Sequence, residues 1–258
     1  MKQAALGLIV PPSNPTLEVE IRELLGEAPH LYTSRLPFCQ DSDLDRRNGV
    51  YREACLDTAL RFGTLPLRGI AVGCTGAFYA LGPEEDRRRC QAISTRLAVP
   101  VLSASLASVA LIQRLGFRRI QLELPYPDWL IAQAVTYFSA AGLEVVAAHS
   151  LLQPLEVEHP YAVEVTQLEG CLRQLRVEPD TLVFLSGTGM FSVAALAAVL
   201  GECDLPLLSA NLATASWLLG RLEPPGQGSL LLRQLMTRLQ GWAPAVEAHG
   251  PDLLFNPY

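Results

Sequence analysis

The chain has 258 residues, of which 50% are hydrophobic and 18% are charged, and its formal net charge is −6 at pH 7. This composition predicts a well-filled core and excludes wholesale disorder. The acidic balance and the lack of a Lys/Arg-rich tract with interleaved aromatics argue against a nucleic-acid partner. No apolar run reaches the ~18 residues that span a bilayer, and the apolar N-terminal stretch is too short for a signal peptide. We therefore expect a cytoplasmic protein with no membrane partner.

Short apolar runs recur along the chain, each flanked by Gly, Pro or polar residues, as is typical of buried strands. The seven predicted strands are 4–10, 67–73, 99–105, 118–124, 143–150, 180–186 and 205–211. Longer segments with helical spacing separate most of them, for example 14–28 and 127–142. Strands that alternate with such helices predict an α/β fold, with mostly parallel sheets flanked by helices.

Three strand-to-helix junctions are written twice, in the same order and at nearly constant spacing. The matched pairs are GCTG at 73–76 with SGTG at 186–189, PVLSAS from Pro100 with PLLSAN from Pro206, and, more loosely, LIVPPSNPTLEVEI from Leu8 with LELPYPDWLIAQA from Leu122. This duplication predicts two pseudo-symmetric α/β lobes, the first formed by 1–115 plus 215–258 and the second by 116–214. Because parallel sheets bind ligands beyond the carboxyl ends of their strands, we expect one cleft between the lobes, surrounded by these junctions.

The best-matched pair of loops has the chemistry of an anion site. Cys74 ends a predicted strand and precedes a predicted helix, where free amides and the helix dipole lower a thiol's pKa and attract anions. Thr75 adds a hydroxyl, and Gly76 lets a ligand approach the backbone closely. The loop at 186–189 repeats these features without the thiol. Taken singly, each loop can also be an ordinary tight turn, the first with a buried cysteine.

The third pair of junctions adds further candidate groups. Pro11 and Pro12 stiffen the exit of the first strand, and Asn14 can either bind a carboxylate or cap the helix that follows. In the matching junction, Tyr126 lies two residues beyond a strand. Its phenol can donate to an oxyanion or lie as an aromatic ring at the rim of the cleft.

Other kinds of site find little support. The chain has no Walker loop, dinucleotide fingerprint or nucleophile elbow, and its six cysteines form no CxxC pair or metal-type grouping. We treat the five cysteines other than Cys74 as structural free thiols. The basic run Arg87–Arg89 follows three acidic residues, which predicts a solvated helix face. Further pocket residues are expected from two loop-like regions, 36–50 and 151–161.

Together these features resemble the aspartate/glutamate racemase superfamily, and more closely its branch with maleate cis–trans isomerase and arylmalonate decarboxylase. The resemblance is carried by LGLIVPPSNPTLEVEI, by the PY at 125–126 and by the GCTG and SGTG loops, and it spans nearly the whole chain. It implies a site without metal or cofactor that acts on a small carboxylate, with Cys74 and Tyr126 as catalytic residues. The expected substrate-binding residues are Pro11, Asn14, Thr75, Gly76, Gly187, Thr188 and Gly189.

Gly187 stands where racemases and maleate isomerases usually carry a second cysteine, which disfavours a two-thiol racemase. Our first hypothesis is decarboxylation of a substituted malonate, in which Cys74 protonates an enediolate-type intermediate. The first alternative is maleate cis–trans isomerisation, in which Cys74 adds to the double bond. An amino-acid or 2-substituted acid racemase and a non-catalytic dicarboxylate-binding protein remain as further alternatives. The sequence is compatible with a monomer or a homo-oligomer.

Overall fold

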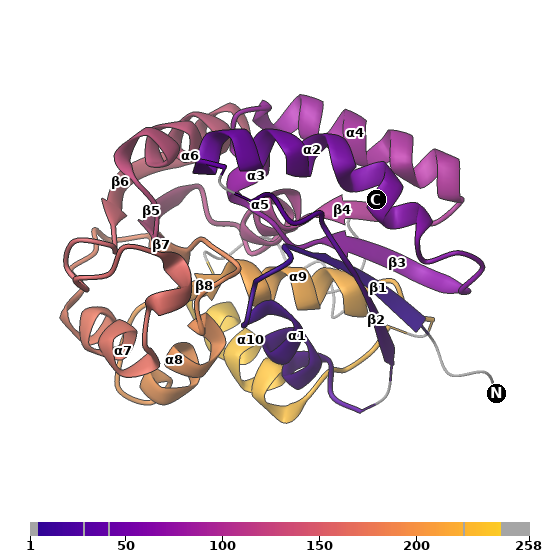
Figure 1. Ribbon diagram of the computed structural model, residues 1–258. Coiled ribbons are helices and arrows are strands. Elements are labelled where there is room, and N and C mark those ends of the chain that lie inside the picture. Colours follow the sequence, from indigo (N-terminus) through magenta and orange to yellow (C-terminus); the bar gives the residue numbers. More distant parts are fainter. Residues whose placement is uncertain (1–4, 28, 41, 224, 244–258) are drawn as a thin grey trace.

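The computed structural model describes residues 5–243 except 28, 41 and 224, and contains two four-stranded parallel sheets flanked by helices (Figure 1). The strand order is β2-β1-β3-β4 in the first sheet and β6-β5-β7-β8 in the second, so the two sheets share one topology. The strands are β1 (Ala5–Val10), β2 (His30–Arg35), β3 (Leu67–Val72), β4 (Val101–Ser103), β5 (Arg119–Leu124), β6 (Glu144–Ser150), β7 (Thr181–Leu185) and β8 (Leu207–Ser209). The predicted two-lobe α/β fold is confirmed.

Helices connect consecutive strands and cover the sheets, and two further helices follow the last strand. They are α1 (Leu17–Leu25), α2 (Leu44–Leu60), α3 (Gly76–Tyr79), α4 (Gly82–Leu97), α5 (Ala104–Arg114), α6 (Asp128–Ala140), α7 (Val165–Gln174), α8 (Ser192–Val199), α9 (Ala210–Leu219) and α10 (Leu230–Trp242), with a 3₁₀ turn, η1, at Pro160–Ala162. Within the described residues, none of these helices has the length and apolar character needed to cross a bilayer. The predicted lobe boundaries stay a prediction, and the part of the first lobe placed after residue 243 lies outside the described residues.

The central strands explain why the sequence reads as continuous apolar runs. Every residue of β1 and β7 is buried, because helices cover both faces of each sheet. By contrast, in β2 at the edge of the first sheet only Leu31 and Ser34 are buried. Strand β2 was missed in the sequence for this reason, since its mostly polar residues HLYTSR lack the apolar run that reveals the other strands.

The duplication also appears at the interface between the two halves of the chain. Helices α5 and α9 follow the matched strands β4 and β8 and pack against each other. Each begins with the same cap, because Ser103 Oγ accepts from the amide of Leu106 at 3.1 Å and Ser209 Oγ accepts from the amide of Leu212 at 3.2 Å. The serines of the repeated sequences LSAS and LSAN thus stabilise equivalent helix starts.

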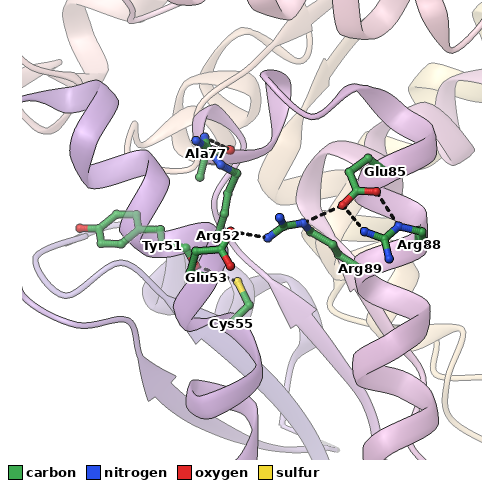
Figure 2. Close-up of polar contacts among 8 residues, drawn as sticks. All are labelled: Tyr51, Arg52, Glu53, Cys55, Ala77, Glu85, Arg88 and Arg89. Carbon is green, nitrogen blue, oxygen red and sulfur yellow. Dashed lines mark hydrogen bonds and ion pairs between the residues drawn. The ribbon is translucent and has the colours of Figure 1, made fainter.

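An ion-pair network joins α4 to α2 on the outside of the first sheet (Figure 2). Glu85 pairs with both Arg88 and Arg89, and Arg89 also pairs with Glu53 of α2 at 2.8 Å. These residues form the solvated helix face that the sequence predicts. Asp86 is the exception: it is fully buried and accepts hydrogen bonds from Ser103 Oγ at 2.6 Å and from Tyr137 at 2.7 Å.

Candidate active site

The loops that follow β3 and β7 face each other at the carboxyl ends of the two sheets. We call residues 73–76 the thiol loop and residues 186–189 the glycine loop. Thr188 Oγ1 of the glycine loop donates to the carbonyl of Gly73 in the thiol loop at 3.0 Å. Tyr79, just after the thiol loop, shares a hydrogen bond with Ser186. The two halves of the duplication are therefore joined directly through their repeated loops.

A cavity of about 50 Å³ lies between these loops. Seven of the nine predicted site residues line it: Pro11, Asn14, Cys74, Gly76, Tyr126, Thr188 and Gly189. The other two, Thr75 and Gly187, lie directly behind this wall. Thr75 contacts the Tyr126 hydroxyl, and a Cβ placed on Gly187 would lie 3.4 Å from that hydroxyl. The structure thus brings together all the residues that the sequence selected, while their roles stay predictions.

Cys74 is nearly buried on the cavity wall, and burial raises the pKa of its thiol to about 11. A hydrogen bond with the backbone of Ala77 and the charges of Arg47 and Arg52 lower this pKa, but by less than burial raises it. The expectation of a lowered thiol pKa is therefore wrong. The loop does lead into α3, but removal of the sulfur from water outweighs the amide and the two cations.

The Tyr126 hydroxyl lies between the two loops. It shares a 3.0 Å hydrogen bond with Thr75 Oγ1, and it would be 3.6 Å from a Cβ placed on Gly76. Burial, followed by the nearby Tyr79 and Cys74 groups, raises the pKa of Tyr126 well above its usual value. The phenol therefore keeps its proton at neutral pH and is placed to donate to an oxyanion formed in the cavity.

Gly187 has a conformation that a side chain would strain. Its φ is +116°, and a Cβ added there would lie 2.9 Å from Cγ and 3.0 Å from Cδ of Pro125. Both the left-handed backbone and the rigid proline ring oppose a larger residue. A second thiol at this position would require the glycine loop to move.

Asn14 caps the helix that follows it, as one of the two expectations from the sequence has it, while its binding of a carboxylate stays a prediction. Its Oδ1 accepts from the amides of Thr16 at 2.9 Å and Leu17 at 3.0 Å, which fixes the start of α1. Its Nδ2 donates to the carbonyl and the hydroxyl of Thr188 at 3.2 and 3.3 Å. The amide group is thus already oriented toward the cavity by the backbone it caps.

Several residues that line the cavity were not singled out in the sequence. The 36–50 region is not all loop, because α2 begins at Leu44 behind an Asp43 side-chain cap. Its first turns place Leu44, Arg47, Asn48 and Tyr51 on the wall, and the second expected region adds His159, Pro160 and Tyr161. Asp43, a preferred N-cap residue before a long segment without proline, is the signal in the sequence that could have revealed this helix.

Helix α2 also fixes the thiol loop from outside. Asn48 Nδ2 donates to the carbonyl of Gly76 at 3.4 Å, and Arg52 donates to the carbonyl of Ala77 at 2.9 Å. Figure 2 shows the Arg52 side chain extending to Ala77. It also shows the ion pair between Arg89 of α4 and Glu53, the residue that follows Arg52 in α2. The backbone that carries Cys74 is therefore anchored to a helix that is itself tied to its neighbour.

A buried carboxylate fixes the glycine loop in turn. Glu20 of α1 accepts from the amide of Val193 at 2.7 Å and from Asn211 Nδ2 at 2.7 Å. Asn211 Nδ2 also lies 3.4 Å from the carbonyl of Thr188. Burial raises the pKa of Glu20 from 4.5 to about 7, although these hydrogen bonds lower it. Glu20 was not selected from the sequence, because an acidic residue on an amphipathic helix normally faces solvent.

The site offers thiol, phenol, hydroxyl and amide groups. All six cysteines are free. Among the described residues, no group of three or more His, Cys, Asp or Glu side chains is placed to bind a metal ion. The arrangement can bind a carboxylate, donate to an oxyanion and present one sulfur to a bound carbon.

Comparisons with known proteins agree with this geometry. The maleate isomerase of Geobacillus stearothermophilus is 29% identical over 256 residues, covering 89% of this chain and 98% of that protein. A structure of a Nocardia farcinica maleate cis–trans isomerase variant with a covalently bound succinylcysteine intermediate superposes with a TM-score of 0.77 at 24% identity, covering 90% of this chain and 98% of the other. Arylmalonate decarboxylase gives a TM-score of 0.68 at 20% identity, with 89% and 99% covered. The arylmalonate decarboxylase family profile matches residues 6–230, and the chain belongs to this family of enzymes, which is related to the maleate isomerases.

Proposed function

We propose that this protein is a cis–trans isomerase of maleate or a closely similar cis-dicarboxylate, with Cys74 as its nucleophile. The observation that carries the proposal is the position of the Cys74 sulfur on the wall of a small cavity, which it shares with groups of the opposite loop. The extended similarity to maleate isomerases supports it. This assignment replaces malonate decarboxylation, our first hypothesis from the sequence, as the preferred function.

The size of the cavity favours a short substrate. Pockets for drug-sized ligands measure roughly 300–1,000 Å³, whereas this one measures about 50 Å³ and has Tyr161 on its wall. The Tyr161 ring packs so tightly on Gly189 that a Cβ at Gly189 would lie 2.4 Å from it. A four-carbon diacid suits this space better than a malonate that carries an aryl ring.

The proposed reaction is a reversible addition. The sulfur of Cys74 bonds to one alkene carbon, the π electrons move to the other carbon, and the thiol proton ends on that carbon. The product is a succinyl thioether whose new C–C single bond can rotate. Loss of the same sulfur from the rotated adduct, with return of a proton to it, gives the trans diacid.

Neighbouring groups are placed to assist this addition. Electron density that reaches the second carbon spreads into its carboxylate, and the protonated Tyr126 hydroxyl can donate to that oxyanion. On the glycine-loop side, Asn14 Nδ2 donates to Thr188 and Thr188 Oγ1 donates to the carbonyl of Gly73, so these groups bind a carboxylate by exchanging their present acceptors for its oxygens. Because burial raises the pKa of Cys74, the sulfur starts as a thiol, and its proton is available for transfer to carbon.

A covalent adduct in a relative supports the same chemistry. In the Nocardia farcinica variant, a cysteine has been replaced by serine and a succinylcysteine is still present. An adduct of this type therefore forms on a remaining cysteine in that enzyme. Formation of such an adduct needs one thiol, which Cys74 supplies in the site described above.

Proton NMR of maleate incubated with purified protein tests the proposal. We expect conversion to fumarate, its loss in Cys74→Ala, and its retention in Cys171→Ala, a matched control on α7 away from the cavity. No conversion by the wild-type protein, or equal conversion by Cys74→Ala, would refute the assignment. Binding of maleate without turnover in both proteins would instead indicate a dicarboxylate-binding protein.

Malonate decarboxylation remains the second candidate, and one observation favours it. A thiol with a pKa of about 11, opposite a glycine, is suited to deliver one proton to one face of an enediolate. If this candidate is correct, substituted malonates should release CO₂ and give one enantiomer of the deuterated acid in heavy water. A two-thiol racemase is disfavoured by the strain that a side chain at Gly187 would cause.

A further inference from the structure

Arg47 is a charged residue on the cavity wall that the proposed reaction does not use. It lies one turn after the start of α2, next to Asn48, and shares the cavity with Tyr51. No Asp or Glu is among the described residues that line the cavity, and its only other titratable cation is the imidazole of His159. The cavity therefore has a positive character that depends on Arg47.

The guanidinium of Arg47 differs from those of nearby arginines. Arg35 pairs with Glu18 and donates to the carbonyls of Pro11 and Pro12, and Arg52 donates to Ala77. Within the described part of the chain, no side-chain hydrogen bond or ion pair engages Arg47. A partly buried guanidinium carries five N–H donors in a planar fork, and it is stabilised when an acceptor fills that fork.

Electrostatics place Arg47 close to the reacting sulfur and to the 159–161 segment of the cavity wall. Its charge lowers the pKa of Cys74 and of Tyr161, although burial has the larger, opposite effect on each. For His159, burial and then Arg47 both lower the pKa, so this imidazole is neutral at pH 7. Arg47 is thus the one full positive charge among the described lining residues at neutral pH.

We propose that Arg47 is a specificity-determining residue that binds the second carboxylate of the substrate and selects dianionic over monoanionic ligands. The inference rests on the proposed function, and it assigns the two carboxylates to different walls. One carboxylate lies on the glycine-loop side, where Asn14 and Thr188 exchange their present acceptors for its oxygens, and the other accepts from the Arg47 fork on the α2 side. Cys74 then faces the carbons between them.

Binding of a carboxylate by the Arg47 guanidinium explains how a site whose other donors are neutral distinguishes a carboxylic acid from its amide. Hydroxyl and amide donors bind a carboxylate and a carboxamide with similar geometry, because both present a carbonyl oxygen. A guanidinium instead makes two parallel, charge-assisted hydrogen bonds to a carboxylate, and it loses one of them when an –NH₂ replaces an oxygen. Maleate should therefore bind much more tightly than its monoamide.

Isothermal titration of the full chain in a Cys74→Ala background, which cannot carry out the proposed reaction, with maleate and with maleamate, its monoamide, tests this inference. We expect Arg47→Met to weaken maleate binding by about 10- to 100-fold and to leave maleamate binding nearly unchanged, so that the preference for the diacid disappears. Arg47→Lys should keep part of the preference, because it retains the charge but not the fork. The matched control is Arg46→Met, which changes an exposed arginine next to Arg47 in the chain.

The outcomes separate this inference from the proposed function. Unchanged maleate affinity on Arg47→Met substitution, an equal loss for both ligands, or no maleate binding by the parent Cys74→Ala protein would overturn the role of Arg47. The proposed reaction cannot proceed in the Cys74→Ala background. If maleate binds there through Arg47 but the wild-type protein forms no fumarate, the isomerase is refuted and the Arg47 site remains established. Urea unfolding of each variant verifies that the fold is intact.

Discussion

The thiol loop and the glycine loop occupy matching strand-to-helix junctions of the two sheets, and they differ in the group that the proposed reaction uses. Both follow a fully buried stretch of strand, both contain Thr-Gly, and each contacts the other across the cavity. The thiol loop carries Cys74, whereas the glycine loop carries Gly187 at a φ of +116°. The two loops therefore form similar walls of the cavity, and of the two only the thiol loop carries a sulfur.

The two loops are also fixed by different means. Asn48 and Arg52 of α2 donate to carbonyls just after Cys74. The glycine loop is instead connected to Glu20 through Asn211 and the start of α8. Substitutions of Arg52 or Cys74 therefore test the thiol-loop side of the site. Substitutions of Glu20 or Gly187 test the glycine-loop side.

The largest expected effect concerns the reactivity of the thiol loop. Because burial raises the pKa of Cys74 to about 11, the thiolate fraction should increase about tenfold per pH unit between pH 7 and 10. Alkylation by iodoacetamide, followed by peptide mass spectrometry, should accelerate without a plateau over this range. A plateau below pH 8 would show that the thiol is not held in the buried state described above.

The second largest effect is expected at Glu20, whose hydrogen bonds hold the glycine loop in place. Replacing Glu20 by Ala leaves the amide of Val193 and the Asn211 side chain without their acceptor inside the protein. We expect a loss of about 3 kcal/mol in the free energy of unfolding, measured by urea denaturation. Glu23→Ala on the exposed face of the same helix is the control. Equal stability of the two variants would mean that Glu20 is not an anchor.

Glu20 also gives the protein a defined pH dependence. Its pKa is raised from 4.5 in the unfolded chain to about 7 in the fold, so the folded protein binds this proton more tightly. The resulting stability is present below pH 4.5 and is lost as the pH rises through 7. Between pH 5 and 8, the wild-type protein should lose up to about 3 kcal/mol more than Glu20→Gln. Parallel pH profiles of the two proteins would contradict this expectation.

A smaller effect is expected where the two loops diverge. Gly187→Ala should lower the free energy of unfolding by about 1–3 kcal/mol, because it strains the backbone and contacts Pro125. Gly170→Ala in α7 has open space around it and should be neutral or slightly stabilising. If both variants behave alike, the glycine loop accepts a side chain and the absence of a second thiol has no structural cause.

The smallest effect is expected at Arg52, which supports the thiol loop from helix α2. Arg52→Met removes the donor to the Ala77 carbonyl and should cost about 1 kcal/mol of unfolding free energy. Arg46→Met, on the same helix, should change stability less. A larger loss for the control would show that Arg52 does not support the loop.

Much of this organisation could be predicted from the sequence because it is repeated. The matched junctions predict two similar lobes and draw attention to Cys74, Tyr126 and Thr188, whose expected roles come from the resemblance to the family. The strand β2 was missed because an edge strand has little apolar sequence. The 36–50 region was expected to add pocket residues, but Arg47 and Asn48 could not be singled out within it, because they lie outside the repeat on a helix whose buried face includes polar residues.

Electrostatic properties were the least predictable from the sequence. The position of Cys74 before a helix suggests a lowered pKa, yet the packing of α2, Tyr126 and the 159–161 segment removes its sulfur from water. Glu20 occurs in the sequence as one of several acidic residues on α1, and its burial depends on Asn211, which lies far along the chain. Such effects arise from contacts between distant segments, which periodicity and local motifs do not report.

The most direct test of the central claim is mass spectrometry of the protein after rapid acid quenching in the presence of maleate. We predict a mass increase equal to one maleic acid molecule on the peptide that contains Cys74, and no such adduct in Cys74→Ala. An adduct on another cysteine, or rapid fumarate formation by Cys74→Ala, would contradict a single-thiol site at Cys74.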